Sequence, residues 1–78
     1  MISLDQLEKG VKAVIEHMDT NDLPLKLIEM GCLPGNTVQL IQKAPFNDPL
    51  YLNIDGAHLA IRNEIAQHIF VRLVDWNE

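Results

Sequence analysis

The sequence has one cysteine and only four aromatic residues among its 78 positions. A single cysteine cannot form a disulfide within the chain, so nothing marks the protein as a disulfide-stabilised secreted domain. No apolar run approaches the roughly 20 residues that a membrane-spanning helix needs, and the first ten residues lack the basic and apolar regions of a signal peptide. We therefore expect a soluble, cytoplasmic chain that does not insert into a membrane.

Neither the aromatic nor the basic residues are clustered. The aromatic residues are Phe46, Tyr51, Phe70 and Trp76, too dispersed to line a groove for proline-rich peptides. Six lysines and arginines stand against eleven acidic residues, which gives a net charge of −5. Nucleic-acid binding depends on clustered cations that neutralise phosphates, so that role is excluded. An acidic surface instead suits a basic patch on another protein.

The sequence also lacks the motifs of catalysis and of tight metal binding. It has no glycine-rich phosphate loop, no paired cysteines and no His-Glu-x-x-His. His17, His58 and His68 are far apart with no ligand at helical spacing, so we expect surface histidines. Cys32 has no electropositive neighbours to activate its thiol, and we predict that it packs as a small apolar residue. Since no nucleophile–base pair is visible, we do not expect an enzyme.

What the sequence does contain is a series of short apolar runs separated by turn signals, typical of a small all-β barrel. Residues 11–18 and 36–44 predict two strands, and residues 69–74 predict a last one, because apolar residues alternate in each. The inward positions of these strands are predicted to be Val11, Ala13 and Ile15, then Val38 and Leu40, then Ile69, Val71 and Leu73.

The clearest local signal is Asp55-Gly56 between two alternating runs. This dipeptide is typical of a two-residue type I′ hairpin turn, and the turn fixes the register of the two strands. The predicted pairs are Ile54 with Ala57, Asn53 with His58, Leu52 with Leu59, Tyr51 with Ala60, and Leu50 with Ile61. The apolar face that this register creates is predicted to face the core.

A short helix is predicted between the first two strands. Asn21 or Asp22 is expected to cap it, and Pro24 fits its first turn. Its apolar face is predicted to comprise Leu23, Leu27 and Met30. Gly31 is expected to end the helix in a left-handed conformation, with Cys32 packing back beside it.

A second helical turn, capped by Asn63 and ending at Gln67, is expected before the last strand. These elements predict a mostly β protein, a small SH3-like barrel of about five strands with one α-helix and one helical turn. The chain is expected to form a single domain over residues 1–78.

The segment from Lys43 to Leu50, KAPFNDPL, permits two interpretations. Two prolines bracket an Asn-Asp turn, and Asn47 tolerates the left-handed backbone that a stiff turn requires. The segment is either a plain hairpin connection or a rigid ledge that presents Phe46 to a partner. Both interpretations stay open, since loops carry function more often than cores do.

The ordered motifs resemble the ferrous iron transport protein A (FeoA) family. They are LEKG at 7–10, LKLIEMGCLPGNTVQL at 25–40, and KAPFNDPLYLNIDGAHLAIRNEIAQHIFV at 43–71. Some positions depart from the family pattern. Phe46-Asn47 stands where Leu-Gly is common, Lys26 stands where arginine is common, and Cys32 occupies a position that usually holds an aliphatic residue.

The resemblance implies a small cytoplasmic accessory or regulatory protein of bacterial Fe²⁺ uptake, without enzymatic activity. Its implied partner is a membrane Fe²⁺ transporter of FeoB type that carries a cytoplasmic GTP-binding domain. As an alternative, the chain is a metal-sensing module related to the C-terminal domain of metal-dependent repressors. Fe²⁺ or another divalent ion would then bind weakly, with His58 and Cys32 as the candidate ligands; otherwise no cofactor is expected.

The partner surface is predicted at two stiff turns, because proline lowers the ordering cost of binding. The predicted contact residues are Leu33, Pro34, Gly35, Pro45, Phe46, Asn47, Asp48 and Pro49. The sequence leaves open the oligomeric state, including self-association. It also leaves open whether a metal binds directly and whether the partner's GTPase activity rises or falls.

Overall fold

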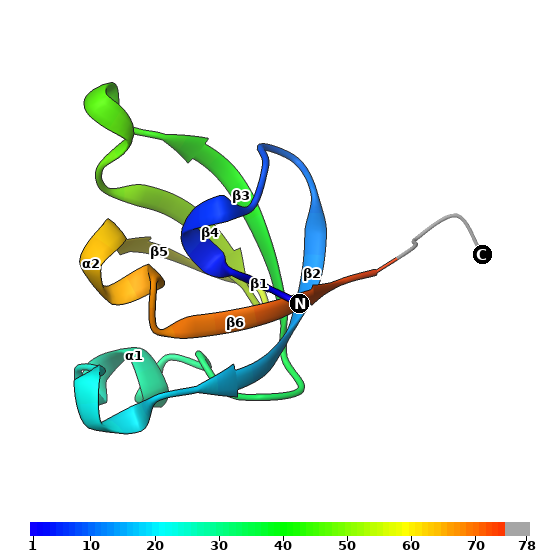
Figure 1. Cartoon of the computed structure of the whole chain (residues 1–78), viewed down its shortest axis with the longest axis vertical. Coiled ribbons are helices and arrows are strands. Elements are labelled where there is room, and N and C mark those ends of the chain that lie inside the picture. Colours follow the sequence, from blue (N-terminus) through cyan, green and yellow to red (C-terminus); the bar gives the residue numbers. More distant parts are fainter. Residues whose placement is uncertain (75–78) are drawn as a thin grey trace.

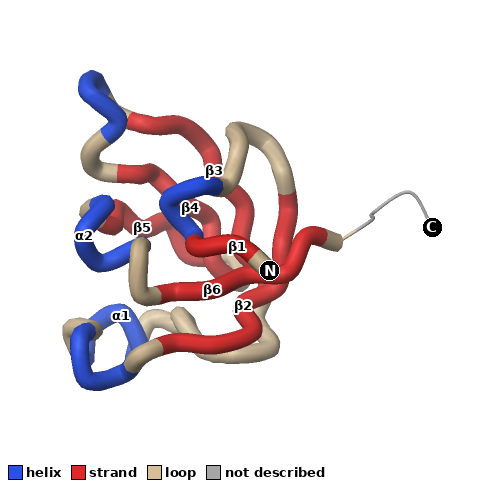
Figure 2. The backbone as a smooth tube through the Cα atoms, viewed as in Figure 1, coloured by secondary structure: helices blue, strands red, loops and turns tan. Residues whose placement is uncertain are grey.

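The computed structural model describes residues 1–74. It is a six-stranded antiparallel sheet in the order β1-β6-β2-β3-β4-β5, curled around one core with short helices at its ends (Figure 1; Figure 2). The strands are β1 (Ile2–Ser3), β2 (Lys12–Met18), β3 (Thr37–Lys43), β4 (Leu50–Ile54), β5 (Ala57–Ile61) and β6 (Ile69–Leu73). The mostly β prediction is confirmed. The five predicted strands correspond to β2, β3, β4, β5 and β6, and β1 was not predicted. Trp76 lies outside the described residues.

The helical elements are all short. They are α1 (Leu25–Glu29), α2 (Asn63–Ala66) and the 3₁₀ turns η1 (Leu4–Gln6), η2 (Thr20–Asp22) and η3 (Pro45–Asn47). Within residues 1–74, no helix is long and apolar enough to cross a membrane.

The β4–β5 hairpin forms with the predicted register, from Ile54 opposite Ala57 to Leu50 opposite Ile61. Asp55 and Gly56 have φ angles of 49° and 92°, as a type I′ turn requires. The side chain of Asn53 stabilises the turn, since its Oδ1 accepts a hydrogen bond from the Gly56 N–H at 2.9 Å. The local signal was therefore sufficient to fix this part of the fold.

The core collects the inward positions of five strands. Its fully buried large side chains are Leu4, Leu7, Ile15, Val38, Leu40, Leu50, Leu52, Ile54, Ile61, Ile69 and Val71, with Cys32 among them. Leu4 is the first residue of η1 and Leu7 directly follows it, ahead of the first predicted strand. The prediction for Leu73 was wrong, because its side chain is 55% exposed at the end of β6.

Helix α1 ends as predicted. Gly31 has a φ of +104°; its N–H donates to the Ile28 carbonyl at 3.1 Å, and the Cys32 N–H donates to the Leu27 carbonyl at 3.0 Å. This pair of bonds defines a Schellman cap, and it directs Cys32 back into the core. The Asn36 side chain strengthens the cap by donating to the Gly31 carbonyl at 2.6 Å.

The other helix boundaries differ from the predictions. Pro24 itself occupies the N-cap of α1 with no side-chain cap, because residues 20–22 form the separate turn η2. Met30 was predicted to face inward but is 38% exposed, since α1 ends before it. Asn63 is the first residue of α2 rather than its cap, a position that Arg62 takes.

Candidate functional site

Cys32 has the structural role that the sequence predicts. Its side chain is 0% exposed. Burial away from water disfavours the thiolate and raises the pKa of the Cys32 thiol from 9.0 to about 11. The thiol is therefore protonated at neutral pH, which makes it a poor nucleophile and a poor metal ligand.

The histidines are dispersed over the molecule. His17 and His58 are exposed, as predicted, and the His17 ring lies 6.0 Å from the ring of Phe70. The surface prediction was incorrect for His68, which is half-buried between α2 and β6. Among the side chains that the structure describes, no three of histidine, cysteine, aspartate or glutamate come together as a metal site. His58 and Cys32 therefore belong to no such group of three.

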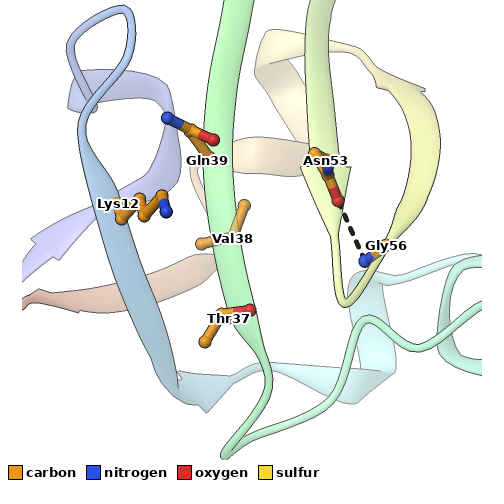
Figure 3. A pocket seen from close by; sticks show the side chains of 6 residues that line it. All are labelled: Lys12, Thr37, Val38, Gln39, Asn53 and Gly56. Atoms are coloured by element: carbon orange, nitrogen blue, oxygen red, sulfur yellow. Dashed lines mark hydrogen bonds between the residues drawn. The ribbon is translucent and has the colours of Figure 1, made fainter. Parts of the chain in front are cut away.

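A polar hollow of about 210 Å³ lies on the outer face of the sheet (Figure 3). Its lining residues are Lys12, Thr37, Val38, Gln39, Asn53 and Gly56. Gln39 Nε2 donates to the Gly10 carbonyl at 2.8 Å, and Asn53 Oδ1 accepts from Gly56. Because these polar groups already hold the strands and the hairpin turn, they do not converge on a substrate position.

The loop between β3 and β4 is a closed, hydrogen-bonded turn. The Asn47 N–H donates to the Ala44 carbonyl at 2.8 Å, and the Ala44 N–H donates to the Pro49 carbonyl at 3.0 Å. Asn47 has the left-handed backbone that the sequence predicted, with a φ of 63°. Phe46 also has a positive φ, 66°, which the sequence did not predict.

Asn63 of α2 braces this loop from the side. Its N–H donates to Asp48 Oδ1 at 3.0 Å, and its side-chain amide donates to the Asn47 carbonyl. The Phe46 side chain at the tip is 99% exposed. The loop is thus the connection that one interpretation predicted, and it also has the rigidity that the ledge interpretation requires.

The fold separates the two halves of the predicted partner surface. The 45–49 loop follows Lys43, which pairs with Leu50 at one end of the β3–β4 ladder. The 33–35 turn lies beyond the other end, where Val38 pairs with Ile54, so the two turns occupy opposite ends of the molecule (Figure 1). They cannot belong to one small contact surface.

The 33–35 turn also has a structural role. The Gly35 N–H donates to the Ile15 carbonyl at 2.8 Å, and the Ile15 N–H donates to the Asn36 carbonyl at 3.0 Å. These two bonds attach the turn to β2. Leu33 remains partly exposed beside them.

Sequence reasoning missed an apolar depression beside β5. One hollow of about 390 Å³ is lined by Ile41, Tyr51, Leu52, His58, Leu59 and Ala60. A second, of about 300 Å³, is lined by Lys26, Leu27 and Met30 together with His58, Leu59 and Ala60. The predicted hairpin register already placed Tyr51 opposite Ala60 on the outer face, which was the available signal.

The sequence matches the FeoA domain family over residues 2–73. It is 35% identical over 75 residues to a protein of Porphyromonas gingivalis (strain ATCC BAA-308 / W83) described as an Fe(2+) transport protein A/Fe(2+) transporter FeoB fusion protein. That match covers 95% of this chain but only 9% of the relative's length.

Two solved structures share the fold at modest identity. The iron(II) transport protein A of Clostridium thermocellum superposes with a TM-score of 0.81 at 30% identity, over 94% of this chain and 46% of that chain. FeoA of Stenotrophomonas maltophilia, described as a prokaryotic SH3 domain protein complexed with zinc, superposes with a TM-score of 0.76 at 25% identity. That match covers 92% of this chain and 91% of the other, and it confirms the SH3-like prediction.

Proposed function

Because this chain belongs to the FeoA domain family, a family of small non-enzymatic proteins of ferrous iron transport, we propose that it acts in the cytoplasm by binding a FeoB-type transporter. The contact would involve the transporter's cytoplasmic GTP-binding domain and would regulate uptake. The observation that carries the proposal is the relative in which a matching domain and FeoB form one polypeptide. Fusion gives two modules a high effective concentration, which favours pairs that work in contact.

The 45–49 loop is the part of the surface best suited to such a contact. Phe46 is 99% exposed and its ring is buried by nothing within residues 1–74. Aromatic side chains are common anchors of protein interfaces. The hydrogen bonds from Asn63 fix the loop beforehand, so docking would order little additional backbone. We place the centre of the contact at Phe46, with Pro45, Asn47, Asp48 and Pro49 around it.

The test measures binding of this chain to the full-length transporter in lipid nanodiscs. Wild-type protein should bind, and Phe46→Ala should weaken binding at least tenfold. Leu33→Ala is the matched control, because Leu33 is also an exposed apolar residue but lies at the opposite end. If Leu33→Ala alone weakens binding, the contact lies at the 33–35 turn instead. Absence of binding, with normal Fe²⁺ uptake after deletion of the gene, would contradict the proposed function.

A further inference from the structure

Strand β5 has one edge with no strand beside it. It stands last in the sheet and pairs only with β4 in the described part of the chain. Ile54 and Ala57 flank the two-residue turn as a hydrogen-bonded pair. Hydrogen-bonded and non-hydrogen-bonded pairs alternate along an antiparallel hairpin. Asn53 with His58 and Tyr51 with Ala60 are therefore non-hydrogen-bonded pairs. The backbone N–H and C=O groups of His58 and Ala60 therefore point away from β4.

The strand itself lacks the sequence and register features that normally prevent strand addition. Natural edge strands are very short, charged, bulged or interrupted by proline. Strand β5 has five residues, Ala-His-Leu-Ala-Ile, and keeps an unbroken register with β4. At the opposite edge, β1 is only two residues long. The sheet thus has one edge strand that is very short and one that is long enough to pair with a further strand.

The surroundings of β5 indicate what could occupy that edge. The two hollows described above meet at His58, Leu59 and Ala60. Ile41 and Tyr51 border one side. Leu27 of helix α1 and Met30, the residue that follows this helix, border the other. Because α1 stands beside the edge, the space suits one extended segment better than the sheet of a second copy.

Charge narrows the class of ligand further. Lys26 is the one formally charged residue that lines either hollow, and the other lining residues are apolar apart from Tyr51 and His58. We propose that β5 binds an extended apolar peptide carrying an acidic side chain, as an added strand. His58 and Ala60 would exchange backbone hydrogen bonds with it, apolar side chains would pack on Tyr51, and its carboxylate would face Lys26. This inference does not depend on the FeoB-type transporter as the source of the peptide.

The test selects peptides from a random display library on the immobilised full chain. Enriched sequences should alternate apolar residues and carry an acidic residue. For the best one, N-methylation of the amides on the edge that faces β5 should weaken binding at least tenfold, whereas N-methylation on the other edge should not. Amide chemical shifts of the protein should change most at residues 57–61.

Variants of the chain supply the controls. Ala60→Pro removes an outward-pointing donor and should weaken binding at least tenfold. Since proline could also disturb the strand, Lys26→Glu provides a second variant, which should weaken the acidic peptide and restore binding to the same peptide with lysine in its place. Phe46→Ala should bind normally. Three results would overturn the proposal. They are absence of enrichment, insensitivity to N-methylation, and dimerisation of the chain, measured by light scattering, that Ala60→Pro abolishes.

Discussion

Replacing Phe46 with glycine should stabilise the folded protein while weakening its binding to the FeoB-type transporter. The residue has φ +66° and ψ +16°, in the left-handed region. A residue with a Cβ atom pays about 1–2 kcal/mol for that conformation. Glycine adopts it without strain but loses more entropy on folding, by about 0.5–1 kcal/mol. The ring is 99% exposed, so its removal sacrifices no burial.

At the midpoints of these ranges, the net expectation is a gain of about 0.75 kcal/mol, or about 3–6 °C in Tm for a domain of this size. The measurement is thermal and urea unfolding followed by circular dichroism. Phe46→Ala is the control, because it removes the ring but keeps the left-handed strain. Its stability should lie within about 0.5 kcal/mol of wild type.

The two variants separate the effect of the backbone strain on stability from the effect of the ring on binding. Both should lose transporter binding to a similar extent, because both lack the ring, and only the glycine variant should gain stability. A fall in Tm of more than 2 °C for Phe46→Gly would refute the reasoning, since it would mean that the ring is packed or that the backbone is not left-handed.

Four further predictions concern the rest of the chain. Gly31→Val should destabilise the protein by about 2 kcal/mol in urea unfolding, more than the helix-propensity difference, because a Cβ is strained at φ +104° although the nearest side-chain atoms lie at ordinary contact distance. Asn63→Ala should cost about 1 kcal/mol and speed amide exchange at Asn47, since it removes the side-chain bond to that residue's carbonyl. Cys32 should react with a thiol reagent at pH 7 only at the rate of unfolding; fast labelling of native protein would contradict its burial. Burial raises the pKa of the Cys32 thiol from 9.0 to about 11. The part of the free energy of unfolding that depends on this thiol should therefore be fully present below pH 9 and be lost as the pH rises toward 11. A pH titration of stability, compared with Cys32→Ala, measures this loss.

Sequence patterns predicted the elements whose causes are local. The β4–β5 register follows from Asp55-Gly56 and the alternation around it, and the helix end at Gly31 follows from the need for a positive φ. The burial of Leu4 and Leu7 was missed, because their contacts come from distant parts of the chain and the alternation of apolar and polar residues stops after Asp5. Strand β1 was missed for the same reason.

The candidate sites show a similar division. The stiffness of the 45–49 loop was predictable from its prolines and Asn47. The left-handed backbone of Phe46 was not predictable, because phenylalanine rarely adopts that conformation. The separation of the two turns that the sequence predicted to contact a partner could have been foreseen. They flank a strand of seven residues, and a strand rises about 3.3 Å per residue, so they had to lie roughly 20 Å apart.

The position of β6 within the sheet has a consequence for biosynthesis. The strand lies between β1 and β2, pairing Ile2 and Ile15 with Val71. When a ribosome has made the first 60 residues, β2, β3, β4 and most of β5 exist, yet β1 has no strand to pair with and β2 lacks one neighbour. A nascent chain stalled before residue 69 should therefore remain sensitive to protease. The barrel closes only after the late-made β6 inserts between the two oldest strands.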